Sequence, residues 1–248
     1  MSLYRCDLHL HSCLSPCGDE DMTPGNIVGM SLLNGLQIVA LTDHNSTKNC
    51  PAFFKIAKAN GIIPVAGMEL TTAEDVHAVC LFRDLESAMA FGEYVDAHRF
   101  KIQNQPEIFG RQLITDEDDE VIGEEEFLLL NASYLSLEEA YAEVKARGGV
   151  CYPAHIDRAS NGIIAMLGDF PPDPHFTAFE LRDAQKLEEC RSKHPVLAER
   201  GLTHVVSSDA HYLTDIAEQG FEIEIDDEPY SSQRVRDKLI DLLLGKEP

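Results

Sequence analysis

Six histidines and three carboxylates have the residue types and the spacing of ligands for metal ions. The set consists of His9, His11, Asp19, His44, Glu69, His77, His155, Asp209 and His211. His9 and His11 stand two residues apart, and residues two apart on a strand point to the same face. Asp209 and His211 repeat that spacing. Neutral imidazole suits zinc, iron and manganese, and a bridging carboxylate offsets their charge, so the set predicts a metallohydrolase with two or three divalent ions.

Segments with strand and helix character alternate along the chain and must position these groups. Apolar runs predict strands at residues 4–11, 37–42, 62–67, 76–82, 149–153, 177–181, 204–207 and 221–225. Helix signals predict helices at residues 24–34, 51–60, 85–98, 136–148 and 232–244. Among these signals are Thr23 followed by Pro24, and the capping box formed by Ser136 and Glu139. Nearly every ligand candidate comes just after a predicted strand.

This alternation predicts a parallel sheet, either open and doubly wound or closed as a barrel. A barrel gathers all its strand ends around one site, whereas an open sheet does so only near a switch point. Because the ligand candidates belong to at least six strands, we expect an α/β barrel with the site on its top face. The 248 residues suit a single domain. A strongly acidic stretch at residues 100–131, with a hairpin near Asp118 and Asp119, is interpreted as an insertion.

Charge and composition restrict the kinds of molecule that the protein can bind and where it can act. The formal charge is −23, from 43 acidic and 20 basic residues, and two or three divalent cations offset only about four to six units of it. We therefore expect no broad basic footprint for duplex DNA, and an anionic substrate must be attracted locally. No apolar run approaches the roughly 18 residues of a membrane span, and the first residues lack the apolar stretch of a signal peptide. With seven scattered cysteines, these features predict a cytoplasmic enzyme with reduced thiols.

The motifs resemble those of the PHP family, the polymerase and histidinol phosphatase domains. The matching segments are Asp7-Leu8-His9-Leu10-His11-Ser12, Thr42-Asp43-His44, Gly67-Met68-Glu69, His77, Pro153-Ala154-His155 and Ser208-Asp209-Ala210-His211. The resemblance covers nearly the whole chain and implies a single-domain distorted (β/α)7 barrel with up to three metal ions. By analogy, three ligand sets follow: His9, His11, Glu69 and Asp209; Glu69, His77 and His155; and Asp19, His44 and His211.

The loop that carries Asp19 departs from the family pattern, because it is longer than the usual Ser-Asp-Gly. Asp19 is preferred since it lies five residues before Pro24, as the family's aspartate does before its proline. Glu20 and Asp21 are the alternatives. Asp7 and Asp43 are interpreted as acceptors that orient an imidazole and not as ligands.

The chemistry follows from the metal ions. Divalent ions about 3.5 to 4 Å apart lower the pKa of bound water and neutralise a leaving oxygen, which suits phosphate ester hydrolysis by a metal-bound hydroxide. Glu69, His211 and Arg158 are the catalytic candidates. Arg158, three residues after His155, resembles the phosphate-binding arginine of family members that act on nucleoside 3′,5′-bisphosphates and short oligonucleotides. Arg182 and Lys186 are further candidates for binding substrate.

We therefore expect a metal-dependent phosphoesterase that uses manganese, iron or zinc and acts on a small phosphorylated molecule, with a nucleotide or short oligonucleotide favoured. A phosphomonoesterase of the histidinol phosphate type is the alternative within this class. A non-catalytic module with structural metal ions is an alternative of another class, although filled ligand positions argue against it. An amidohydrolase on a similar barrel would usually offer a ligating lysine, and none is evident in the sequence.

Overall fold

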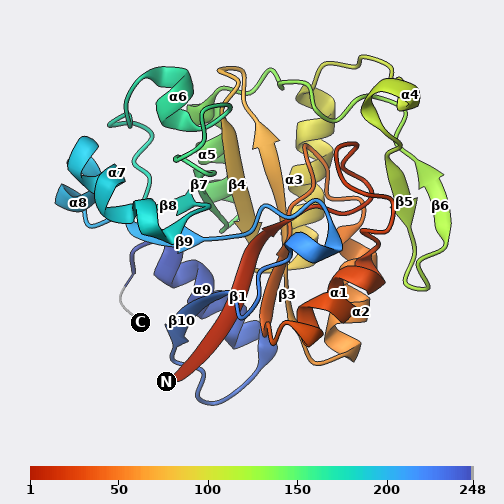
Figure 1. Ribbon diagram of the computed structural model, residues 1–248, viewed down its shortest axis with the longest axis horizontal. Coiled ribbons are helices and arrows are strands. Elements are labelled where there is room, and N and C mark those ends of the chain that lie inside the picture. The colour runs from red at the N-terminus through yellow and green to blue at the C-terminus, as the bar shows by residue number, and fades with distance from the viewer. Residues whose placement is uncertain (247–248) are drawn as a thin grey trace.

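A mixed sheet, curled into a partial barrel, forms the centre of the computed structural model, which describes residues 1–246 (Figure 1). Six strands are hydrogen-bonded in the order β10-β1-β2-β3-β4-β7, and β8 and β9 form a separate parallel pair. The bounds of these strands are β1 Ser2–Leu10, β2 Ile38–Leu41, β3 Ile63–Thr71, β4 His77–Phe82, β7 Val150–Pro153, β8 Ala178–Leu181, β9 Thr203–Val206 and β10 Phe221–Ile225. A bridge between Leu10 and Ala210 brings the chain after β9 back to β1. The predicted α/β, barrel-like class of fold is confirmed.

The sheet is not uniformly parallel, which corrects the expectation of a regular series of parallel strands. β4 runs antiparallel to both β3 and β7, and β10 runs antiparallel to β1. Only residues 72–76 connect β3 to β4, and so short a segment cannot make the crossover that a parallel neighbour requires. His77 is therefore the first residue of its strand, paired with Thr71 at the end of β3. The reversal still brings His77 to the edge of the sheet where Glu69 lies.

Apolar side chains fill both faces of the sheet. One cluster joins one face to the helices α1 (Pro24–Leu33), α2 (Cys50–Ala59), α3 (Leu85–His98) and α5 (Leu137–Ala146). A second cluster joins the other face to α9 (Ser232–Leu243), which lies beside β10 in Figure 1. The short helices beside β8 and β9 are α6 (Ile163–Leu167), α7 (Leu187–Lys193) and α8 (Val196–Glu199), with a 3₁₀ turn at η1 (Ala184–Lys186). A second 3₁₀ turn, η2 (Leu213–Asp215), packs against α1. Within residues 1–246, no helix is long and apolar enough to cross a membrane.

Two of the predicted helix starts form the hydrogen bonds that their sequences indicate. Thr23 accepts a hydrogen bond from the backbone N–H of Asn26, and Pro24 occupies the first helical position of α1. At α5, Ser136 accepts from the N–H of Glu139, whose carboxylate in turn accepts from the N–H of Ser136. These local rules worked because each depends only on neighbouring residues.

The acidic segment at residues 100–131 forms a lobe beside the sheet (Figure 1). It contains α4 (Pro106–Phe109) and an antiparallel hairpin of β5 (Leu113–Thr115) and β6 (Val121–Glu124). Asn45, the residue after His44, donates hydrogen bonds to the carbonyls of Leu129 at 2.7 Å and Asn131 at 3.0 Å. The lobe therefore restrains the loop that carries His44.

A buried ion pair fixes the same lobe to α3. Glu125, whose side chain is 5% exposed, accepts from the guanidinium of Arg99 at 2.6 Å and also contacts Lys48. The side chain of Arg99 is only 2% exposed, so removing Glu125 leaves this buried charge with one carboxylate partner, the half-exposed Asp96 at 2.8 Å. Glu124, the neighbouring residue, pairs with Arg111 at the surface.

We predict that Glu125→Ala lowers the free energy of unfolding by about 1.5 to 3 kcal/mol, because Arg99 loses its buried hydrogen-bonded partner and keeps only the half-exposed Asp96. Glu124→Ala is the matched control and should change the free energy far less, because water screens its pair with Arg111. Urea denaturation of both variants measures the difference. Equal losses for the two variants would show that the Arg99 pair does not stabilise the lobe.

Candidate metal centre

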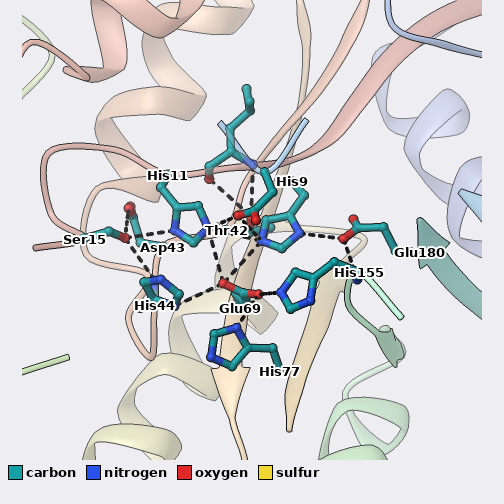
Figure 2. Close-up of polar contacts among 12 residues, drawn as sticks. His9, His11, Ser15, Thr42, Asp43, His44, Glu69, His77, His155 and Glu180 are labelled. Atoms are coloured by element: carbon teal, nitrogen blue, oxygen red, sulfur yellow. Dashed lines mark hydrogen bonds and ion pairs between the residues drawn. The ribbon is translucent and has the colours of Figure 1, made fainter. Parts of the chain in front are cut away.

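A single buried carboxylate, that of Glu69 in β3, lies at the middle of the histidine cluster (Figure 2). Five imidazole nitrogens approach its two oxygens: His77 Nδ1 at 2.8 Å and His155 Nε2 at 2.9 Å from Oε1, and His44 Nδ1 at 3.1 Å, His9 Nε2 at 3.3 Å and His11 Nε2 at 3.3 Å from Oε2. The register of β3 puts Glu69 level with the ends of β1 and β2, because His44 pairs with Glu69 directly after β2. Long-range strand pairing therefore assembles the cluster.

Hydrogen bonds fix the two imidazoles of β1 with their Nε2 atoms toward the centre. His9 Nδ1 lies 2.9 Å from Glu180 Oε1, and since a carboxylate only accepts, His9 carries its proton on Nδ1. The Ser15 hydroxyl donates to Asp43, so it accepts from His11 Nδ1 at 3.1 Å. In neutral rings, both Nε2 atoms then present lone pairs.

This arrangement fits bound cations. His9 Nε2 and His11 Nε2 face each other at 3.1 Å, a contact that two lone pairs disfavour unless a cation or proton lies between them. Glu69 Oε2 and Asp209 Oδ1 are buried beside them and have no hydrogen-bond partner within residues 1–246. A cation shared by these four groups satisfies all of them.

The structure brings eight of the nine predicted ligands together. Three groups have ligand atoms within 4.8 Å of one another: His9, His11, Glu69 and Asp209; His44, Glu69 and His77; and His11, His44 and His211. His155 joins them through its contact with Glu69. The first group is one of the sets implied by the family resemblance, whereas the other two share ligands differently. Which ion each group holds remains a prediction.

Asp19 is the residue that the structure does not place among the ligand groups. Its backbone N–H donates to the carbonyl of His211 at 2.9 Å, so the loop lies beside the cluster. Its carboxylate accepts from the N–H of Asp21 at 2.9 Å and so turns toward its own loop. Glu20 and Asp21 are exposed and belong to none of the groups found in residues 1–246.

Without a bound ion, the surroundings raise the pKa of some of these histidines and lower the pKa of others. Burial lowers the pKa of His11, but the adjacent carboxylates of Asp209 and Glu69 outweigh it and raise that pKa to about 9. Burial likewise lowers the pKa of His9, yet Glu180, Glu69 and Asp209 raise it well above the usual range. Burial and the neighbouring His11 lower the pKa of His211 to about 4. Cations and protons therefore compete for His9 and His11.

The backbone at two predicted ligands is itself strained. His155 has a φ of 29° and Asp209 a φ of 51°, values that residues other than glycine rarely adopt. Such a conformation persists where the surroundings fix it, and it concentrates at functional sites. His155 comes two residues after β7 and Asp209 three residues after β9, so this strained backbone lies where the chain turns out of the strand toward the cluster.

Sequence reasoning missed Glu180 and assigned Asp7 the wrong partner. Glu180 lies in β8, is fully buried and accepts from both the His9 ring and the backbone N–H of His155, at 2.9 and 3.1 Å. A glutamate inside the short apolar strand β8 was the available signal. Asp7 does not orient an imidazole: its carboxylate accepts backbone N–H groups of Ser208 and Ala217 at 3.1 and 3.3 Å. Asp43 acts on His11 only indirectly, through Ser15.

Two arginines lie on one side of the centre. Arg158 Nη1 donates to Asp209 Oδ2 at 2.9 Å, and Arg182 Nε lies 4.0 Å from the same oxygen. The side chains of both arginines remain more than a third exposed, which leaves donors for a ligand. Lys186 lies 3.4 Å from Asp157, which also accepts from the N–H of Arg182. The three predicted substrate residues therefore lie close together.

Comparison with protein families gives one match over most of the chain. A model of the PHP domain family matches residues 7–228. An uncharacterized protein of Methanocaldococcus jannaschii is 28% identical over 101 residues, which make up 37% of this chain and 59% of that protein. The chain therefore spans less than two thirds of the length of this relative.

Several solved structures share the fold at low sequence identity. The lesion-specific endonuclease EndoQ of Pyrococcus furiosus has a TM-score of 0.64 at 17% identity, over 98% of this chain and 56% of that chain. A candidate metal-dependent phosphoesterase of Bifidobacterium adolescentis has a TM-score of 0.59 at 20% identity, over 83% and 87%. An amidohydrolase of Chromobacterium violaceum has a TM-score of 0.55 at 20% identity, over 89% and 91%. An endonuclease Q has also been solved with a 27-mer duplex that carries an abasic lesion.

We predict that Glu180→Gln weakens metal binding by about 10- to 100-fold, because the amide loses the charge that makes His9 a stronger ligand. Glu222→Gln, on the exposed side of β10, is the matched control and should keep the parent affinity. Competition with a chromogenic chelator measures both affinities. Unchanged binding in Glu180→Gln would remove Glu180 from the metal centre.

Proposed function

Because the chain belongs to the PHP domain family of metal-dependent phosphoesterases, we propose that it hydrolyses phosphate esters at the centre around Glu69. The observation that carries the proposal is the approach of five imidazoles to one buried carboxylate, with the Nε2 atoms of His9 and His11 facing each other. Such a cluster is costly to bury for stability alone, since without bound cations its carboxylates are offset only when buried imidazoles take up protons.

The residues present account for the parts of a phosphoesterase site. Bound divalent ions supply an activated water near neutral pH and neutralise charge on phosphate oxygens. Glu69 belongs to two of the three ligand groups, so it is the candidate ligand that bridges two ions. His211 donates from Nδ1 to the carbonyl of Asp209 at 2.9 Å, which leaves its Nε2 free to accept. Arg158 and Arg182 place positive charge next to Asp209, where a phosphate would contact the centre.

The favoured substrate is a small phosphorylated molecule of the nucleotide class, such as a nucleoside 3′,5′-bisphosphate or a short oligonucleotide. Arg158 and Arg182 at Asp209, together with Lys186 at the adjacent Asp157, support this proposal, because three cationic side chains suit a ligand with more than one anionic group. The acidic composition does not exclude a duplex, since an endonuclease of the same fold has been solved with one. The expectation against duplex nucleic acid is therefore withdrawn.

Two alternative functions remain distinguishable. A phosphomonoesterase of the histidinol phosphate type would use the same centre without needing the cationic group. An amidohydrolase shares the fold, but Lys48, the lysine nearest in sequence to His44, contacts Glu125 and is not directed to the ligand groups. Protein loaded in turn with manganese, iron and zinc should release phosphate or alcohol from phosphate esters in a panel that includes nucleoside bisphosphates. Amide hydrolysis alone, or metal binding without any turnover, would contradict the proposal.

We predict that Glu69→Gln lowers kcat/KM by at least about 100-fold on the best substrate of that panel, because a bridging carboxylate serves two ions at once. Asp19→Ala should cost less than about tenfold, because its carboxylate is turned away from the cluster. Glu69→Gln should also bind fewer metal ions than the parent, whereas Asp19→Ala should keep the parent's metal content. Elemental analysis measures both. A greater loss in Asp19→Ala than in Glu69→Gln would reverse the proposed roles.

A further inference from the structure

Asn49, the residue before α2, joins the acidic lobe to the loop that follows β1. It is fully buried. Its amide nitrogen Nδ2 donates to the carbonyl of Leu113 at 3.1 Å and to the hydroxyl of Ser12 at 3.0 Å, and its amide oxygen accepts from the N–H of Thr115 at 3.1 Å. Leu113 and Thr115 belong to the lobe, whereas Ser12 directly follows the predicted ligand His11. One side chain therefore bonds to the lobe and to the ligand-bearing segment at once.

These bonds are unusual for the position that Asn49 occupies. An asparagine at the start of a helix usually accepts a hydrogen bond from an N–H of the first turn. Within residues 1–246, the Asn49 side chain makes no such bond to α2. Its amide nitrogen faces the carbonyl of Leu113, which only accepts, so the orientation of the amide is fixed. The side chain therefore serves the joint between the lobe and the loop, and not the start of its own helix.

From Ser12, hydrogen bonds between buried groups continue to two predicted metal ligands. The Ser12 hydroxyl donates to Asp43 at 2.6 Å, and Asp43 also accepts from the Ser15 hydroxyl at 2.7 Å. The Ser15 oxygen accepts from His11 Nδ1 and from the backbone N–H of His44, both at 3.1 Å (Figure 2). All five residues are buried. A continuous route of hydrogen bonds thus runs from the lobe to an imidazole of the metal centre.

The lobe supplies no ligand to the three groups found in residues 1–246, but it holds the segment between β1 and α1 at further points. The N–H of Leu113 donates to the carbonyl of Cys13 at 2.9 Å. Asp119 accepts from the Thr23 hydroxyl at 2.8 Å and from the N–H of Gly25 at 2.9 Å. A side chain at residue 25 would collide with Asp119, so this close approach requires glycine. The fit indicates that the lobe fixes this segment in one position.

We propose that Asn49 is a positioning residue of the metal centre, through which the acidic lobe fixes the ring of His11. When Ser15 accepts from Nδ1, the neutral ring keeps its Nε2 lone pair for an ion. Without the bond from Asn49, Ser12 and Asp43 lose a partner that fixes them, and the Ser15 hydroxyl is free to turn away from the ring. The inference rests on the metal centre of the proposed function, but on no particular substrate.

Asn49→Ser tests the proposal, because serine is too short to reach the lobe and Ser12 together. The variant should bind zinc or cobalt at least about fivefold more weakly than the parent, measured by competition with a chromogenic chelator. The bound cobalt should also have a changed visible absorption, which reports the geometry of its ligands and which a loss of stability alone does not alter. Parent affinity together with the parent cobalt spectrum would overturn the proposal.

Phe54→Leu is the matched control. Phe54 is buried in α2, the helix that Asn49 precedes, and its replacement removes apolar packing without removing any of these hydrogen bonds. This variant should keep the parent affinity and spectrum, and urea denaturation checks that both variants fold. Losses as large in Phe54→Leu would show that Asn49 acts only through stability, which overturns the proposal. If Asn49→Ser does not fold, Asn49→Asp keeps the size of the side chain and the acceptor for Thr115, and its cobalt spectrum decides by the same criterion.

A double-mutant cycle tests the route through Ser15. Ser15→Ala removes the acceptor of the His11 ring, so adding Asn49→Ser should weaken metal binding by no more than about a further twofold. Fully additive losses would overturn the route. A parent protein that binds none of the metals would overturn both this inference and the proposed function. A parent protein that binds metal with this coupling but hydrolyses no phosphate ester would support the inference and contradict the proposed function alone.

Discussion

The buried carboxylate of Glu69 is the constraint on which the rest of the site depends. Its two oxygens meet five imidazoles from β1, β4 and the ends of β2 and β7, at distances of 2.8 to 3.3 Å. A carboxylate so deep in the protein needs compensating positive charge, because the interior solvates ions poorly. Burial alone raises the pKa of Glu69, but His77, His9 and His44 together lower it well below the usual range. Glu69 is therefore ionised, and the cluster remains ready to bind cations.

The sequence predicted those parts of the fold and site that depend on local rules. The spacing of His9 and His11 on one strand, and the caps of α1 and α5, follow from periodicity and from neighbouring residues. The reversed direction of β4 was not predicted, although the short connection between β3 and β4, which cannot make a parallel crossover, was the available signal. Glu180 was missed because its partner His9 lies 171 residues away in the chain. The direction of the Asp19 side chain depends on the conformation of its loop, and the number of residues between Asp19 and Pro24 does not determine that conformation.

The local charges explain how an acidic chain can bind an anionic substrate. The formal charge of −23 repels anions at long range, but salt screens it beyond roughly 8 to 10 Å. Within that distance of Asp209 an anionic substrate would meet Arg158 and Arg182 as well as the bound ions. Asp7 helps to hold this side of the site, because it accepts the N–H of Ser208, the residue before Asp209. Recognition is thus confined to one edge of the centre.

The most direct test of the account is the metal content of the protein after reconstitution with manganese, iron and zinc in turn, measured by elemental analysis after removal of free metal. The account predicts two or three ions per chain with at least one of these metals, because the ligand groups that share Glu69 and His11 exceed what one ion can use. Less than one ion per chain with every metal would contradict the claim that this cluster is a metal centre.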